Sequence, residues 1–252
     1  MSYKCQQLPQ IWKHAFVTPV FKNGTTCEAN NYRPISLTST CCRVMERIIN
    51  KQLLDYLLKY RLITKQRHGF IQRKSVCGNL LESLCDWTVN LESRLITDVV
   101  YIDFKKAFDS VSHTNNYFSG PEVLFKTWVA MKFVDDDDDD ELLNLQTYGI
   151  CGDLLGWITS FLSSRTQSIF DALSSVIAVS NGVPQGSVLG PILFLLYVND
   201  IVDIFSGLSV SCKLFADDVK LCSSYSMNMT TLCPKKRPPF IFPITLSKLN
   251  RF

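Results

Sequence analysis

Phe215-Ala216-Asp217-Asp218 places two carboxylates side by side between apolar residues. Adjacent carboxylates repel each other, and burying their charges costs free energy, so such a pair needs a compensating partner. A divalent cation is a common one, because oxygen atoms are its preferred ligands. The flanking stretches 210–216 and 219–222 alternate in polarity as short strands do. The sequence therefore predicts a β-hairpin with the acids at its tip, and an ordinary Asp-rich turn is the alternative.

A third acid occurs in a similar setting. Residues 99–104 form a β-branched and aromatic run in which Asp103 is the one carboxylate. If this strand lies beside the hairpin, three carboxylates converge. Such a cluster can hold two Mg²⁺ ions about 4 Å apart, one activating a 3′-hydroxyl and one neutralising a leaving pyrophosphate. We therefore predict that Asp103, Asp217 and Asp218 are catalytic and metal-ligating residues for nucleotidyl transfer.

Composition favours a nucleic-acid partner. The chain has 252 residues, is 46% hydrophobic and carries a formal charge of +3. Setting aside the six aspartates at 135–140 raises this charge to +9, which suits a phosphate backbone. The ten cysteines include no Cys-x-x-Cys pair, so we expect reduced core residues rather than disulfides or a zinc site.

No targeting or membrane segment is expected. Residues 1–10 lack the apolar core of a signal peptide. The longest strongly apolar run, 188–198, is shorter than the roughly 20 residues of a membrane-spanning helix. The sequence therefore predicts a soluble intracellular protein.

Apolar residues at helical spacing predict amphipathic helices at 42–60, 75–92 and 152–162, and an all-apolar buried helix at 192–198. In the second helix Trp87 shares a stripe with residues 76, 80, 84 and 91, so we expect it in the core. Strands are predicted at 14–21, 165–170 and 175–180. Between the first two helices, residues 65–74 contain four cations, which we expect to contact a triphosphate or template backbone. His68 in this loop is expected to be structural.

Five blocks of sequence together resemble a known family. They are Asn31-Tyr-Arg-Pro-Ile-Ser-Leu, His68-Gly69-Phe70, Tyr101-Ile-Asp-Phe-Lys-Lys-Ala-Phe-Asp-Ser-Val-Ser-His113, Gly182-Val-Pro-Gln-Gly-Ser-Val-Leu-Gly-Pro191 and Phe215-Ala-Asp-Asp218. In this order they resemble the reverse transcriptase domain of non-LTR retrotransposons, the LINE-type elements and especially the jockey-like group. The resemblance covers roughly residues 11–224, with one interruption.

The resemblance implies an α+β fold with the fingers and palm of a right-hand polymerase, an antiparallel palm sheet backed by helices and no thumb. Residues 1–98 would form a fingers-like region, 99–112 the palm strand with Asp103, and 142–225 the rest of the palm. Residues 113–141, which include the six aspartates, would be an acidic low-complexity insertion. Residues 226–252 match nothing expected after the palm. We expect both of these last segments to be disordered.

The resemblance also implies an RNA-directed DNA polymerase that uses an RNA template, a DNA primer, deoxynucleoside triphosphates and two Mg²⁺ ions, which Mn²⁺ could replace, in the nucleus or cytoplasm. Asp218 would act more by electrostatics than by direct ligation. Predicted nucleotide-binding residues are Phe104, Phe108, Gln185, Gly186, Arg73 and Lys74, and predicted template or primer contacts are Arg33, Arg67 and Lys65. The ring of Phe108 would occupy the space of a ribose 2′-hydroxyl and so select deoxynucleotides.

Two other functions remain open at this point. The insertion and the unmatched tail are compatible with a catalytically inactive retroelement remnant that at most binds nucleic acid. An acid-pair protease or a two-metal nuclease fits less well. The sequence has no Asp-Thr/Ser-Gly motif, and the Gly-Val-Pro-Gln-Gly loop has no role in either enzyme.

Overall fold

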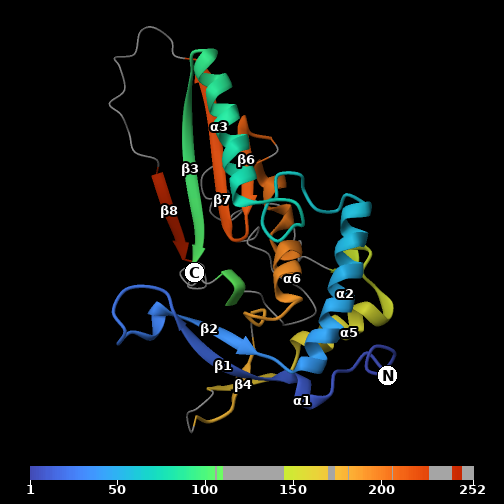
Figure 1. The fold of residues 1–252 in the computed structure, drawn as a ribbon. Helices are drawn as coiled ribbons and strands as arrows, with labels where there is room; N and C mark the ends of the chain where they lie inside the picture. The colour runs from blue at the N-terminus through green and yellow to red at the C-terminus, as the bar shows by residue number, and fades with distance from the viewer. Residues whose placement is uncertain are drawn as a thin grey trace, which may run out of the picture. The chain divides into compact units, whose positions relative to one another are not determined.

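The computed structural model describes residues 1–105, 107–109, 145–169, 174–180, 182–205, 207–226 and 240–245. The chain divides into two compact units (Figure 1). Of the described residues, the first unit holds 1–62, 108–109 and 145–198, and the second holds 63–105, 107, 199–226 and 240–245. The predicted insertion at 113–141 lies outside the described residues.

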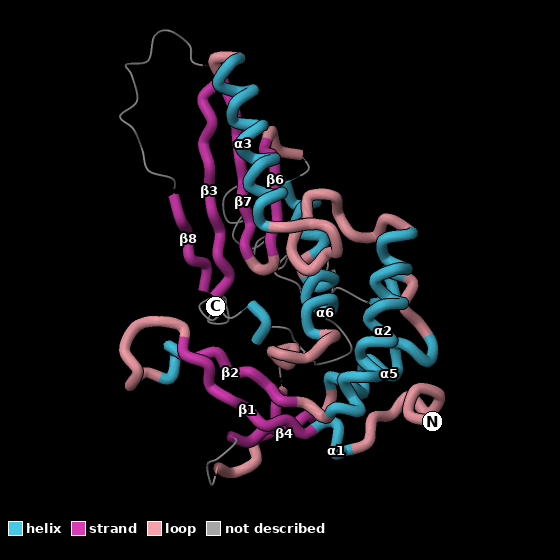
Figure 2. Tube along the Cα trace, in the orientation of Figure 1, coloured by secondary structure: helices cyan, strands magenta, loops and turns pink. Residues whose placement is uncertain are grey.

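The first unit contains a four-stranded sheet in the order β2-β1-β4-β5 (Figure 2). Its strands are β1 (His14–Phe21), β2 (Tyr32–Leu37), β4 (Arg165–Ile169) and β5 (Ile177–Val179). β1 pairs antiparallel with β2 and parallel with β4, and β4 pairs antiparallel with β5. The strands predicted at 14–21, 165–170 and 175–180 are therefore confirmed, although the last is shorter than expected.

Helices complete the first unit. They are α1 (Gln10–Lys13), α2 (Thr40–Lys59), α5 (Gly152–Leu162) and α6 (Gly190–Tyr197), with short 3₁₀ turns at Ala29–Asn31 and Leu145–Tyr148. The amphipathic helices predicted at 42–60 and 152–162 and the buried helix at 192–198 are confirmed. Seven of the eight residues of α6 are buried.

A buried carboxylate of α2 fixes the start of α6. Glu46 is fully buried, and its Oε2 accepts hydrogen bonds from the backbone amides of Val188, at 2.7 Å, and Leu189, at 3.0 Å. These two amides lie just before Gly190, the first residue of α6, and a carboxylate near the start of a helix interacts favourably with the helix dipole. Glu46 thereby holds the end of the Gly-Val-Pro-Gln-Gly loop in place.

The second unit contains a four-stranded sheet in the order β6-β7-β3-β8, with α3 (Val76–Glu92) lying along it (Figure 1). Its strands are β3 (Leu95–Lys105), β6 (Val210–Phe215), β7 (Asp218–Ser226) and β8 (Phe240–Thr245). β6, β7 and β3 are antiparallel neighbours, as predicted for a palm sheet, and β8 runs parallel to β3. β8 comes from the segment for which the sequence predicts no regular structure. A 3₁₀ turn covers Asn199–Phe205.

The two faces of this sheet differ in polarity. Side chains alternate between the faces of a strand, so Ile102 and its partner Val219 lie on one face, with Leu214. All three are buried. The other face carries Lys220 and Lys213, a directly paired couple in β7 and β6. α3 covers this second, polar face, because it supplies the contacts of both lysines.

The predicted core face of α3 is therefore wrong. The stripe expected inside is exposed, with Val76 and Leu80 at 50% and Leu91 at 75%, whereas Asn79 and Ser83 are buried. The reason is the buried ammonium of Lys220, which donates to Asn79 Oδ1 at 3.1 Å and to Ser83 Oγ. Its Nζ also lies 5.8 Å from the centroid of the Trp87 ring, which is half-buried rather than in the core. A buried charge needs polar partners, and these decide which side of α3 faces the sheet.

The cysteines are less buried than predicted. Of the cysteines in the described part of the chain, none forms a disulfide, but only Cys42 and Cys212 are buried. The prediction of core residues is therefore wrong for the others, which are exposed or half-buried.

Among the described helices, none is long and apolar enough to cross a membrane.

Replacing Glu46 tests its role at the start of α6. We expect Glu46→Ala to lower the free energy of unfolding by about 2–4 kcal/mol, since the half-buried amide of Val188 and the buried amide of Leu189 lose a charged acceptor. Glu46→Gln keeps one acceptor oxygen and should lose less. Urea unfolding followed by circular dichroism measures both values. Glu92→Ala, at an exposed position, is the matched control, and an equal loss in the control would contradict the assignment.

Candidate active site

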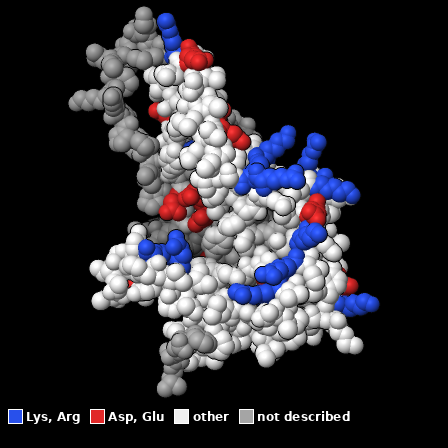
Figure 3. Space-filling view, viewed as in Figure 1, with Lys and Arg blue, Asp and Glu red and all other residues white. Residues whose placement is uncertain are grey.

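The predicted acids meet at one end of the sheet in the second unit. Asp103, near the end of β3, is the register partner of Asp218, the first residue of β7. Directly opposed residues of an antiparallel pair place their side chains on the same face, about 5 Å apart. Asp217 is the second residue of the two-residue turn between β6 and β7 and directly precedes Asp218. Figure 3 shows acidic side chains on the surface at this end of the sheet.

Repulsion from the neighbouring acids affects the pKa of Asp218. The pKa of Asp218 is raised above its ordinary value, first by partial burial and then by the negative charges of Asp217 and Asp103. A cation between the acids would relieve this repulsion, and carboxylate oxygens are ligands that hard divalent ions prefer. In the described residues, no three acidic, histidine or cysteine side chains are already arranged as a metal-ligating group. Carboxylate oxygens are suitable ligands for a divalent ion by their chemistry, but these three side chains would have to move closer together to share one.

The turn that carries Asp217 has an unusual backbone. Ala216 adopts a left-handed conformation with φ of +53°. A two-residue hairpin loop requires such an angle, but glycine is the residue that usually supplies it. For alanine the left-handed region costs about 1–2 kcal/mol. The surrounding structure must hold the turn in this conformation.

Arg67 and Gly69 lie against this turn. Arg67 is fully buried, and its Nη1 donates a hydrogen bond to the carbonyl oxygen of Ala216 at 3.0 Å. The predicted template contact does not fit this geometry, because a fully buried guanidinium supports the turn instead of facing solvent. A Cβ atom on Gly69 would lie 2.2 Å from the amide nitrogen of Ala216, so only glycine allows this approach. The sequence around Gly69 contains no signal for this contact.

A second set of predicted residues gathers in the first unit. Phe108 stacks on Phe194 with ring centroids 4.2 Å apart, and Gln185 Nε2 donates to Asp109 Oδ1 at 2.8 Å. Gly186 has a φ of +100° and packs against Ser36. A cavity of about 250 Å³ opens beside them. Its lining includes Pro34, Ser36, Asp109, Arg165, Gly182 and Gln185.

The carboxylate of Asp109 orients the amide of Gln185. The backbone supports this contact, since the amide of Val183 donates to the carbonyl of Phe108 at 2.8 Å. Gly182, with a φ of +86°, lies against the Asp109 backbone, where a Cβ atom would come within 2.9 Å of the Asp109 Cα. The spacing in the sequence contains no signal for this pairing, because the two residues are 76 positions apart.

The remaining predicted residues differ in exposure. Phe104 is buried on the sheet face opposite to Asp103, so it packs in the core and is not placed to bind a nucleotide. Arg33, Lys65 and Arg73 are exposed, as nucleic-acid contacts require. Lys74 donates from Nζ to the carbonyl oxygen of Lys65 at 2.5 Å, and burial lowers the pKa of its ammonium group.

Comparisons with known proteins agree with these blocks. The family described as reverse transcriptase (RNA-dependent DNA polymerase) matches residues 20–233. The chain is 29% identical over 195 residues to the RNA-directed DNA polymerase from mobile element jockey of Drosophila melanogaster, covering 76% of this chain and 18% of the relative. It is 26% identical over 227 residues to the probable RNA-directed DNA polymerase from transposon X-element of the same species, covering 88% and 22%. The chain thus spans about a fifth of the length of these relatives.

Solved structures share the fold at low sequence identity. Telomerase from Candida tropicalis in complex with a TWJ fragment of telomeric RNA has a TM-score of 0.52 and 12% identity, covering 87% of this chain and 37% of that chain. Apo telomerase from the same species, truncated from its C-terminal domain, has a TM-score of 0.50 and 11% identity, covering 86% and 44%. These likenesses concern the fold alone. With the antiparallel strands of both sheets, they confirm the predicted α+β fold of polymerase fingers and palm.

The raised pKa of Asp218 predicts a gain in stability when its charge is removed. A carboxyl group whose pKa is higher in the folded state destabilises that state increasingly as pH rises above its unfolded value of 3.8. We therefore expect Asp218→Asn to raise the melting temperature at pH 7 without divalent ions, by about 1–3 °C for a partly screened repulsion. The difference should shrink towards pH 4.

Differential scanning fluorimetry at both pH values measures this effect. Asp55→Asn, an exposed acid of α2, is the control for the loss of one negative charge. A melting temperature that falls in Asp218→Asn, or rises equally in the control, would show that the three acids do not repel one another.

Proposed function

Because this chain belongs to the reverse transcriptase (RNA-dependent DNA polymerase) family, we propose that it carries the catalytic centre of a non-LTR retrotransposon polymerase. The reaction is nucleotidyl transfer from a deoxynucleoside triphosphate to a primer 3′-hydroxyl on an RNA template. The observation that carries this proposal is the register pairing of Asp103 with Asp218 beside Asp217. It gathers three carboxylates from two distant parts of the chain at one end of the central strands of one sheet.

Divalent metal ions are a general requirement of the reverse transcriptase family. Two Mg²⁺ ions, for which Mn²⁺ could substitute, would be held here by Asp103 and Asp217. They would supply activation of the 3′-hydroxyl and neutralisation of the pyrophosphate. Asp218 would contribute mainly negative potential, and its pKa is raised first by partial burial and then by the charges of Asp217 and Asp103. The residues of the chain position the reacting groups, because this chemistry depends on geometry and charge more than on a proton shuttle.

Recognition of the nucleotide is assigned to the residues beside the cavity of the first unit. Gln185 is held by Asp109, and Gly186 lets a ligand approach the backbone closely. Phe108 is half-buried on top of Phe194, so its ring has a firm support and an accessible surface. A rigid ring of this size would exclude a ribose 2′-hydroxyl and select deoxynucleotides.

Phosphate contacts are assigned to exposed cations. Arg33 lies on β2, and Lys65 and Arg73 lie in the loop before α3. Guanidinium and ammonium groups at exposed positions bind phosphate oxygens without reading sequence. Lys74 joins them, because its lowered pKa reflects a partly desolvated ammonium that a phosphate would stabilise. Arg67 is left out of this set because it is fully buried.

Primer extension tests the proposal directly. The 252-residue chain is expected to extend oligo(dT) on poly(rA) with dTTP and Mg²⁺, and Asp217→Ala should lower the rate by at least about 100-fold, as for loss of a group that stabilises the transition state. Asp55→Ala is the matched control and should retain the activity. Binding of the template–primer without extension by the wild-type chain would instead support an inactive remnant that binds nucleic acid.

Sugar selection gives a second test. Phe108→Val should lower the ratio of kcat/KM for dTTP over UTP by about 10-fold or more, since a steric exclusion of this kind is worth about 10–200-fold. Steady-state extension with each nucleotide measures the ratio. Phe16→Val, at an exposed position of β1, should leave it unchanged. An unaltered ratio in Phe108→Val would remove Phe108 from the nucleotide site.

A further inference from the structure

A short loop runs along the tip of the β6–β7 hairpin. Residues 66–69, here called the clamp loop, form a parallel bridge with the end of β6. The carbonyl of Gln66 accepts a hydrogen bond from the amide of Leu214 at 3.1 Å, and the amide of His68 donates to the Leu214 carbonyl at 2.9 Å. These two bonds hold the clamp loop in register with the last residues before the turn.

Arg67 extends this contact to the turn itself. Its guanidinium is fully buried and donates to the carbonyl oxygen of Ala216. A bond from a charged donor is stronger than one between neutral groups, particularly where water is excluded. The bond ends on the one residue of the turn that has a left-handed backbone. It therefore favours the orientation of the peptide group that links Ala216 to Asp217.

Gly69 limits the turn by its shape. Its position beside Ala216 leaves no space for a Cβ atom, which would lie 2.2 Å from the Ala216 nitrogen and 3.0 Å from its Cα. The backbone of the clamp loop thus packs directly on the backbone of the turn. Ala216 is held by a hydrogen bond at its carbonyl and by close packing at its amide, which is the kind of surrounding that a strained residue requires.

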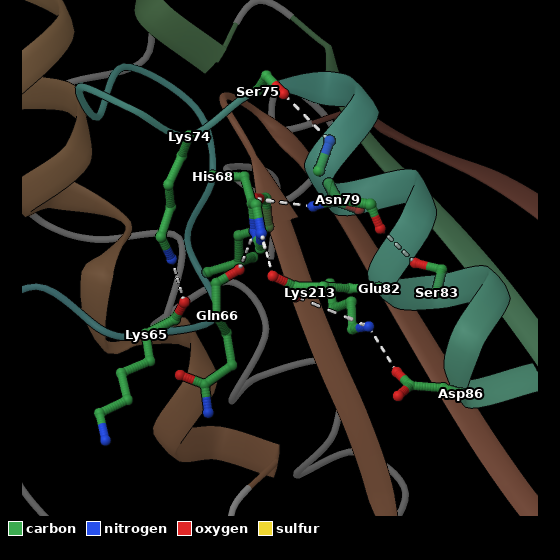
Figure 4. Close-up of polar contacts among 12 residues, drawn as sticks. Lys65, Gln66, His68, Lys74, Ser75, Asn79, Glu82, Ser83, Asp86 and Lys213 are labelled. Atoms are coloured by element: carbon green, nitrogen blue, oxygen red, sulfur yellow. Dashed lines mark hydrogen bonds and ion pairs between the residues drawn. The ribbon is translucent and has the colours of Figure 1, made fainter. Parts of the chain in front are cut away.

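The clamp loop is in turn fixed to α3 (Figure 4). His68 is buried, with Nε2 3.0 Å from Glu82 Oε1 and Nδ1 3.2 Å from the Gln66 carbonyl oxygen. Lys213 of β6 lies 4.0 Å from the other oxygen of Glu82 and 2.5 Å from Asp86. One helix therefore binds both the clamp loop and the strand that leads into the turn.

We infer that the clamp loop fixes the conformation of the turn that carries Asp217 and leads into Asp218, and that Arg67 and Gly69 are positioning residues of the carboxylate site. The turn sets the direction of both acids, because a change of φ at Ala216 rotates the chain that follows it. This inference rests on the proposed function in one respect, namely that the acids bind a divalent metal ion. It assigns Arg67 and Gly69 no contact with substrate.

Metal binding and hydrogen exchange test the inference without turnover. Mn²⁺ binding to the 252-residue chain is followed by electron paramagnetic resonance at a temperature where every variant is folded. Arg67→Met should weaken binding by about 10-fold or more, the usual effect of removing a group that supports metal ligands. Amide exchange at residues 215–218 should become faster. Arg94→Met, an exposed arginine of the same unit, is the matched control and should change neither value.

Ala216→Gly provides a rescue that a merely structural role would not show. Glycine accepts the left-handed conformation without strain, so the single variant should bind Mn²⁺ within about 2-fold of wild type. In Arg67→Met/Ala216→Gly the turn has no strain to release, and binding should recover to within about 3-fold of wild type. Effects that simply add, or a double variant weaker than Arg67→Met, would overturn the inference.

Gly69→Ala tests the same inference through packing, and it can be used if Arg67→Met does not fold. The added methyl group should separate the clamp loop from the turn, weaken Mn²⁺ binding and speed exchange at 215–218. Unchanged binding and exchange in folded Gly69→Ala would overturn the inference. Asp217→Ala separates this failure from that of the proposed function. If wild type and Asp217→Ala bind Mn²⁺ equally, the proposed metal site is refuted. If Asp217→Ala weakens Mn²⁺ binding but Arg67→Met and Gly69→Ala bind like wild type, only the role of the clamp loop is refuted.

Discussion

The pairing of β3 with β7 is the constraint on which the second unit depends. The register runs without interruption from Leu95 opposite Ser226 to Asp103 opposite Asp218. A slip of one residue would move every side chain of β3 to the other face of the sheet and separate the acids. The buried pair of Ile102 and Val219, next to the acids, resists this slip, because it would expose both apolar side chains. Hydrophobic burial on one face thus sets the spacing of the charges on the other.

The same alternation explains what could be read from the sequence and what could not. The spans of α2, α3 and α5 follow from their apolar spacing, and the hairpin follows from the polarity on either side of the two acids. The inward face of α3 did not follow, because helical periodicity describes the helix and not the surface on which it packs. That surface holds Lys220, and an ammonium group without water selects Asn79 and Ser83 over the leucines of the same helix.

The sequence predicts a candidate site residue where the residue type is unusual for its position in the chain. Asp103 and Asp218 are charges in largely apolar strands, and Asp217 stands beside them in the turn, a combination that core packing does not explain. The period of two in a strand already places Phe104 on the sheet face opposite to Asp103, where it is buried. The burial of Arg67 could not be foreseen, because it depends on a loop that returns to a hairpin about 150 residues later in the chain. Cations in a polar loop look alike in sequence until the fold buries one of them.

An alanine at the left-handed position of the turn has a consequence for how the site loses function. Glycine would move gradually among many backbone conformations, whereas alanine has a few discrete and well-separated ones. The turn therefore holds both acids in their native positions or displaces both together, with few intermediate conformations. Loss of the surrounding contacts would then lower the fraction of molecules that are competent. Each competent molecule would keep its normal rate, and the rate of all molecules would not fall uniformly.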